Sequence, residues 1–151
     1  LYRQCLAEGR RQGALKVLDR CQESMPENVW PLDAIPLGFS TNDYMVVNMV
    51  SAYFAAGAPE KAAELGAKLG KELLASAHFY MEYYEYAQDE FEKSCQFLYF
   101  LVDELEKGGD KKVSAELKHS LVTLLRAGAE AYDQDYGNEA DSTVAEDTSA
   151  K

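Results

Sequence analysis

Residues 46–65 show the hydrophobic pattern that organises the rest of the chain. Apolar side chains recur there at intervals of three and four, as on one face of a helix. They are Val46, Met49, Val50 and Tyr53. Gly57 can adopt the left-handed conformation that ends a helix, and Pro59 suits the first turn of the next one. The small side chain of Ala62 would let the two helices approach closely, so this stretch predicts a helix, a tight turn and a second helix.

The same spacing occurs earlier in the chain at a constant offset. Gly9 precedes Gly57 by 48 residues, and Ala14 precedes Ala62 by the same number. The series Leu1, Cys5, Leu18 and Pro26 stands at the same offset from Met49, Tyr53, Gly66 and Leu74. The chain thus contains two copies of one pattern, and they resemble the tetratricopeptide repeat, whose period is about 34 residues.

That repeat has the pattern Trp-x2-Leu-Gly-x2-Tyr, then Ala-x3-Phe, then Pro. Tyr53 and Ala62 match it in the later copy, and Leu1, Ala14 and Pro26 match it in the earlier one. The alternative is an unrelated helical hairpin in which a glycine and an alanine coincide with the pattern. We predict an all-α fold, a tetratricopeptide-repeat-like right-handed stack of about six helices.

The expected helices leave one long insertion and one tail. The helices span 1–8, 10–24, 43–56, 59–76, 79–107 and 111–134, with Thr41 or Asn42 as the cap of the third. Leu117, Leu121, Leu124 and Leu125 are expected to face inward from the last. Between the second and third helices, residues 26–40 are apolar and contain three prolines, which forbid a continuous helix. Residues 1–134 are therefore expected to form the domain, and residues 135–151 an acidic, flexible tail that is poor in large apolar side chains.

Composition narrows the choice of partners. A net charge of −11 over 151 residues argues against nucleic acid as a partner. The first hairpin is basic instead, which fits either a solvated face or a nearby anionic partner. No apolar run is long enough to cross a membrane. Because the chain begins with Leu1 in the middle of a repeat, we expect it to be part of a longer protein.

Catalytic and metal-binding motifs are sparse. The segment Glu116-Leu-Lys-His119 has the spacing of a di-iron carboxylate helix, but such a site needs that motif twice. A stripe of acids at helical spacing comprises Glu82, Glu85, Asp89 and Glu92. We interpret it as a solvated face, and we expect no cofactor. A free-standing helical carboxylate metalloprotein or enzyme is the alternative.

Cys5, Cys21 and Cys95 have no metal-ligand spacing, and we expect buried free thiols. The alternative is a disulfide, for which Cys5 and Cys21 could be neighbours on the two helices of the first hairpin.

One helix face suggests a binding groove. In repeat stacks the first helix of each hairpin lines the concave surface. Here that helix carries Tyr44, Asn48, Ser51 and Phe54 on the face opposite its hairpin contact, and Tyr83 or Tyr84 could lie across the groove. Such a groove would hold an extended peptide or a glycan. The alternative is that the insertion or the tyrosine-rich helix fills it and satisfies the amide of Asn48 internally.

Short segments along residues 1–134 resemble the C-terminal region of a family of large bacterial membrane proteins. They are Leu1-Tyr-Arg-Gln4 before Ala7-Glu-Gly-Arg10, the helix 14–21, Met25-Pro-Glu-Asn-Val29, the hairpin 52–62 and the tyrosine-rich helix that follows it. Proteins of that family carry a multi-spanning N-terminal region similar to protein O-mannosyltransferases and other lipid-sugar-dependent glycosyltransferases. The resemblance places no catalytic residue on this chain. It implies a domain on the periplasmic side of the bacterial inner membrane.

These observations lead to one functional expectation. The chain is a non-catalytic protein-interaction or scaffold domain of a membrane protein that resembles glycosyltransferases. Its partners would be a protein or peptide, or a glycan, and its own upstream membrane domain.

Overall fold

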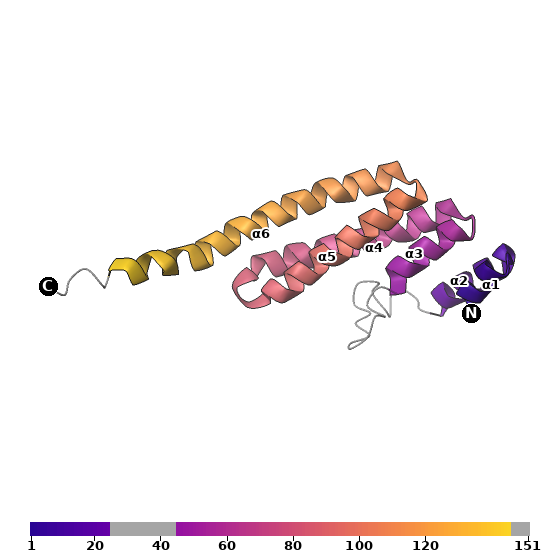
Figure 1. Ribbon diagram of the computed structural model, residues 1–151, viewed down its shortest axis with the longest axis horizontal. Helices are drawn as coiled ribbons and strands as arrows, with labels where there is room; N and C mark the ends of the chain where they lie inside the picture. Colours follow the sequence, from indigo (N-terminus) through magenta and orange to yellow (C-terminus); the bar gives the residue numbers. More distant parts are fainter. Residues whose placement is uncertain (25–44, 146–151) are drawn as a thin grey trace.

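The computed structural model describes residues 1–24 and 45–145, with side chains described as far as Asp133. Six helices pack against one another in these residues, which confirms the all-α prediction (Figure 1). They are α1 (Tyr2–Ala7), α2 (Arg11–Glu23), α3 (Met45–Ala55), α4 (Pro59–Glu82), α5 (Tyr84–Gly108) and α6 (Lys111–Ala145). The predicted insertion 26–40 lies outside the described residues, as does the cap predicted at 41–42.

Three tight turns join the helices into the hairpins α1–α2, α3–α4 and α5–α6. Each turn contains a glycine with positive φ: 72° at Gly9, 82° at Gly57 and 90° at Gly109. In each, the amide of the following residue donates to the carbonyl five residues earlier, with N···O distances of 2.8, 2.9 and 3.0 Å. This bond caps the end of the first helix while the left-handed glycine reverses the chain. The three hairpins are therefore closed in the same way.

The positions around each turn are buried alike. Four residues before the glycine lie Cys5, Tyr53 and Leu105, which are all buried. Five residues after it lie Ala14, Ala62 and Ser114, which are at most 2% exposed. In the third hairpin the buried place belongs to Ser114, whose hydroxyl donates to the Asp110 carbonyl, whereas the adjacent Ala115 is exposed.

The hairpins pack side by side. Helix α3 contacts both α1 and α2, and α5 contacts both α3 and α4. Glycines permit close approaches between helices, since a Cβ on Gly70 of α4 would lie 2.6 Å from Leu117 of α6, and one on Gly108 of α5 would lie 2.3 Å from Phe54 of α3. The largest fully buried side chains are Leu18, Val50, Tyr53, Leu65, Leu98, Leu101 and Leu105. Across the two described stretches, no helix is both long and apolar enough to cross a membrane.

Two helix boundaries differ from the sequence prediction. The predicted helix 79–107 is broken at Tyr83, where φ is −121° and ψ is 34°, so α4 continues to Glu82 and α5 begins at Tyr84. No glycine or proline marks this break. It coincides instead with packing of Tyr84, which is buried against the Phe91 ring at a centroid distance of 5.5 Å. At the other end, α6 continues to Ala145 rather than ending near Gln134.

We expect Ala62→Leu to destabilise the protein by about 1–3 kcal/mol, because Ala62 has no exposed surface and the larger side chain would overpack the contact of α4 with α3. Ala67→Leu is the matched control, since Ala67 is an exposed residue of the same helix. Urea unfolding measures both variants. Equal stability of Ala62→Leu and the parent would contradict close packing at this position.

Candidate interaction surface

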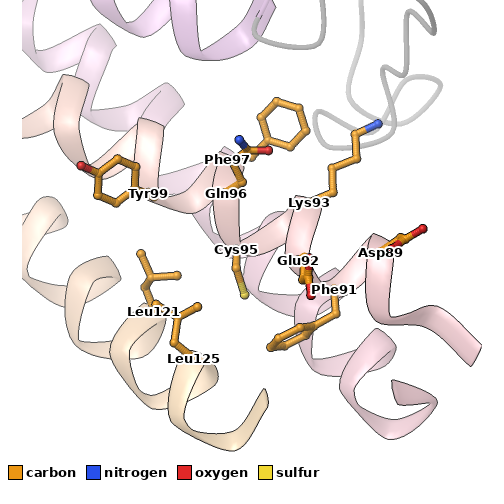
Figure 2. Close-up of a pocket in the computed structure, with 10 residues that line it drawn as sticks. All are labelled: Asp89, Phe91, Glu92, Lys93, Cys95, Gln96, Phe97, Tyr99, Leu121 and Leu125. Atoms are coloured by element: carbon orange, nitrogen blue, oxygen red, sulfur yellow. The ribbon is translucent and has the colours of Figure 1, made fainter. Parts of the chain in front are cut away.

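An open groove runs between α5 and α6. It has a volume of about 710 Å³, and all of its lining residues belong to these two helices. They are Asp89, Phe91, Glu92, Lys93, Cys95, Gln96, Phe97, Tyr99, Leu121 and Leu125 (Figure 2). In the first two hairpins, the corresponding pair of helices is contacted by the first helix of the next hairpin. In the part of the chain that the structure describes, no further hairpin follows α5 and α6.

The floor of the groove is apolar and well packed. Figure 2 shows the Cys95 side chain of α5 pointing toward Leu121 and Leu125 of α6. Gly128 leaves room for the Phe91 ring, because a Cβ there would lie 2.6 Å from its Cε1 atom. Burial, with a smaller effect of Glu92, raises the pKa of the Cys95 thiol to about 11. The thiol is therefore protonated at neutral pH, and it serves as apolar lining rather than as a nucleophile.

The edges of the groove expose apolar side chains of both helices. Tyr99 of α5 is 61% exposed, and Leu125 of α6 is 51% exposed. The prediction that Leu125 faces inward with Leu117, Leu121 and Leu124 is wrong, although those three leucines are buried. Exposed leucine and tyrosine beside a buried apolar floor are typical of a surface that packs against another helix.

A second row of exposed residues continues along α6. Val122, Leu125, Ala129 and Tyr132 are all exposed, and they are spaced at intervals of three, four and three. This row differs from the sequence prediction, in which the leucines of the region all belong to the core. The signal was present in the sequence, since a 3–4 alternation is the spacing of a coiled-coil seam.

The predicted groove residues on α3 are half-buried. Asn48 lines a cavity between α3 and the first hairpin, together with Tyr2, Arg3, Val17, Leu18, Cys21, Met45 and Met49. Phe54 lies at the other end of α3, with its ring packed against Gly108 at the end of α5. Ser51 lies between them in the sequence and is also half-buried. Tyr44 lies outside the described residues, so binding at this face stays a prediction.

The two predicted tyrosines lie far from Phe54. Tyr84 begins α5 and is buried, whereas Phe54 contacts the residue that ends α5. At a rise of 1.5 Å per residue, the length of α5 separates Tyr84 from Phe54 by roughly 35 Å. Tyr83 is 52% exposed, and its ring lies 5.2 Å from that of Phe79. The structure therefore brings together Asn48, Ser51 and Phe54 on one helix, but not Tyr83 and Tyr84 with them.

The residues considered for metal binding are dispersed. Glu116 and His119 are exposed on α6. The break at Tyr83 divides the acidic stripe, so that Glu82 belongs to α4 and the other three acids to α5. Within residues 1–24 and 45–133, no group of three histidine, cysteine or acidic side chains is close enough to hold a metal ion.

A polar cluster ties the first hairpin to the second. The Tyr53 hydroxyl on α3 donates to Asp19 Oδ1 on α2 at 3.0 Å, and it lies 3.1 Å from Gln22 Oε1. Lys61 Nζ on α4 donates to both oxygens of Asp19 at 2.7 and 2.8 Å. Burial, and then Asp19, raise the pKa of Tyr53, so its hydroxyl stays protonated and remains a donor. Three helices thus share one carboxylate.

We expect Tyr53→Phe to lower the free energy of unfolding by about 1–2 kcal/mol, because the variant loses a hydrogen bond to a charged group while the buried ring remains. Urea unfolding measures the change, and Tyr99→Phe is the control because Tyr99 is an exposed tyrosine. A Tyr53→Phe protein as stable as the parent would show that the hydroxyl contributes nothing to docking of the first hairpin.

The polar cluster of Asp19, Tyr53 and Lys61 also predicts that the stability of the protein depends on pH. The hydrogen bond from Lys61 is the main cause that lowers the pKa of Asp19, and the bond from Tyr53 adds to it against the opposing effect of burial. A lowered pKa in the folded state stabilises the protein above the unfolded-state pKa, and this contribution is lost as the pH falls through the folded-state value. We therefore expect the parent to be more stable than Asp19→Asn near neutral pH. The difference should shrink below about pH 4, where the carboxylate becomes protonated. Urea unfolding of both proteins over this pH range checks it, and a constant difference would contradict it.

Comparisons of the chain with models of protein families, with curated proteins and with solved structures found no match. A function for this chain is therefore inferred from features of its own sequence and structure. They are the three equivalent hairpins, the half-buried face of α3 and the open groove between α5 and α6 with the adjoining face of α6.

Proposed function

We propose that this chain is a non-catalytic interaction scaffold, built as a tetratricopeptide-repeat-like right-handed stack. The observation that carries the proposal is the equivalence of the three hairpins. Each one is closed by a left-handed glycine with the same capping bond, and each carries a small buried residue five positions later. The first helix of each later hairpin also contacts both helices of the hairpin before it. This is the neighbour-to-neighbour packing of helical repeats.

Stacks of this kind bind through surfaces that extend across several repeats. The half-buried Asn48, Ser51 and Phe54 on α3 offer polar and aromatic groups for a protein segment or a glycan. The groove between α5 and α6 offers an apolar floor with Asp89, Glu92 and Lys93 at its edge. Both surfaces offer apolar area beside polar groups, on which the side chains of a partner can pack.

The proposal also names the larger protein to which the domain would belong and the side of the membrane on which it would lie. The segments quoted above resemble those of large bacterial membrane proteins, whose N-terminal regions are similar to lipid-sugar-dependent glycosyltransferases. In that setting the chain would lie on the periplasmic side of the inner membrane. It would hold a protein, a peptide or a glycan beside the upstream membrane domain of its own protein.

The sequence encoded upstream of Leu1 tests this setting directly. We expect several segments of about 20 apolar residues there, each long enough to span the membrane. An upstream region with no such segment would refute the membrane setting. Metal analysis of the purified chain tests the alternative, because a stoichiometric content of iron or zinc would favour a carboxylate metalloprotein over a scaffold.

Binding is tested with the purified membrane region and the purified chain. We expect Phe54→Ala to weaken their association, because it removes an aromatic group from the half-buried face of α3. Tyr86→Ala is the control, since Tyr86 is 83% exposed at the far end of α5. Unchanged association of the Phe54 variant would exclude the α3 face from this contact.

A further inference from the structure

We propose that the cavity between α3 and the first hairpin binds a small amphiphile, a free carboxylic acid with a single apolar tail. The cavity has a volume of about 560 Å³, and side chains of α1, α2 and α3 line it. This volume lies within the roughly 300–1,000 Å³ that is usual for small-molecule sites. The proposal goes beyond the scaffold function, because the cavity belongs to one chain and needs neither a partner protein nor a membrane domain.

The lining of the cavity changes from an apolar floor to a charged rim. Leu18 and Met49 are 1% and 4% exposed and form its most deeply buried part. Val17 and Met45 are half-buried, whereas Arg3 is exposed and is the one charged residue of the described lining. Methionine side chains are flexible and adapt to irregular apolar shapes. The floor therefore suits an apolar tail, and the rim suits a charged head group.

The guanidinium of Arg3 is held in place with its terminal nitrogens available. Its Nε donates to the Tyr2 hydroxyl at 3.3 Å, and its Cζ lies 5.9 Å from the centre of the Tyr2 ring. Within residues 1–24 and 45–133, no hydrogen bond or ion pair engages Nη1 or Nη2 of Arg3. Two parallel N–H donors of a guanidinium match the two oxygens of a carboxylate. Arg3 can therefore bind a carboxylate head group through both terminal nitrogens.

The amide of Asn48 adds a neutral donor to the same cavity. Asn48 is half-buried on α3, which α1 contacts. Among the described residues, its side-chain amide has no hydrogen-bond partner. Polar groups that are shielded from water are stabilised by such a partner. A ligand oxygen would supply it, as an acceptor for the amide NH₂ group.

The charges around the cavity favour an anionic ligand. The three acidic residues of the first hairpin each form an ion pair with a basic side chain. These pairs are Glu8–Arg10, Asp19–Lys61 and Glu23–Arg20. Arg3, Arg11 and Lys16 form no ion pair within the described residues, and the described lining contains no acidic side chain. A rim of this charge attracts an anionic head group and disfavours a cationic one.

Titration calorimetry of the full chain with sodium octanoate tests the ligand class. We expect saturable binding of one octanoate per chain. Binding of 1-octanol, which has a similar tail without the carboxylate, should be about 10-fold weaker or more, because the charge-assisted bonds from Arg3 are absent. Arg3→Met should weaken octanoate binding by about 10-fold and leave octanol binding unchanged, since methionine retains an apolar stem without the charge. Arg11→Met is the matched control, because Arg11 is exposed on the same hairpin and does not line the cavity.

Cys21 provides a readout in the unaltered protein. Its thiol is free and half-buried in the lining of the cavity, whereas the free thiol of Cys95 lines the separate groove between α5 and α6. We expect octanoate to slow alkylation of Cys21 by iodoacetamide in proportion to the occupancy of the site. Alkylation of Cys95 should not change. Mass spectrometry of the modified peptides measures both rates, and a Cys21 rate that octanoate leaves unchanged would contradict binding in this cavity.

Three results of the titration would overturn the proposal. They are a parent that does not bind octanoate saturably, a parent that binds octanol equally well, and an Arg3→Met protein that binds octanoate like the parent. Flotation with vesicles of anionic phospholipid separates a free acid from a membrane surface as the ligand. We expect the chain not to float with the vesicles, and flotation in place of octanoate binding would refute the proposal. The association test with Phe54→Ala is separate, so either result can fail without the other.

Discussion

The left-handed glycine turn is the constraint on which the architecture depends. At Gly9, Gly57 and Gly109 the backbone has positive φ, which other residues adopt only with strain. The capping bond then fixes where the first helix stops, and the chain returns beside it. Because the reversal is tight, the residue five positions later faces the partner helix closely and must be small. One local conformation therefore decides both the hairpin and the small size of one buried residue in its second helix.

Packing is uneven among the three hairpins, because each hairpin contacts mainly the one next to it in the chain. Among the described helices, α4 contacts α3, α5 and α6, whereas α1 and α2 reach the others mainly through α3. The carboxylate of Asp19 strengthens this narrow junction by accepting bonds from α3 and α4. Elements with few apolar contacts open most easily. The first hairpin is therefore the part of the molecule whose attachment depends most on a polar cluster.

Local patterns predicted the hairpins well, because turn chemistry and apolar spacing are properties of neighbouring residues. The face formed by Val46, Met49, Val50 and Tyr53 is buried as predicted, and Gly57 ends its helix. The break at Tyr83 could not be predicted, since packing of Tyr84 on Phe91 accompanies it and no breaking residue marks it. Leu125 shows a second limit, because a run of leucines on α6 has more apolar surface than one core face can bury. Sequence pattern alone does not say which leucine remains outside.

The first and last hairpins of the described residues differ in chemistry, and this difference shows where further contacts are to be sought. A hairpin that faces solvent avoids association when its outer face lacks large apolar patches. The first hairpin meets this need with five basic side chains, all of them exposed: Arg3, Arg10, Arg11, Lys16 and Arg20. The hairpin α5–α6 does not, because Tyr99, Val122 and Leu125 are exposed beside an apolar groove. Burying these side chains would release structured water from a surface that the chain itself leaves open. Among the described helices, the free energy available for association is therefore concentrated at α5 and α6 rather than at the basic first hairpin.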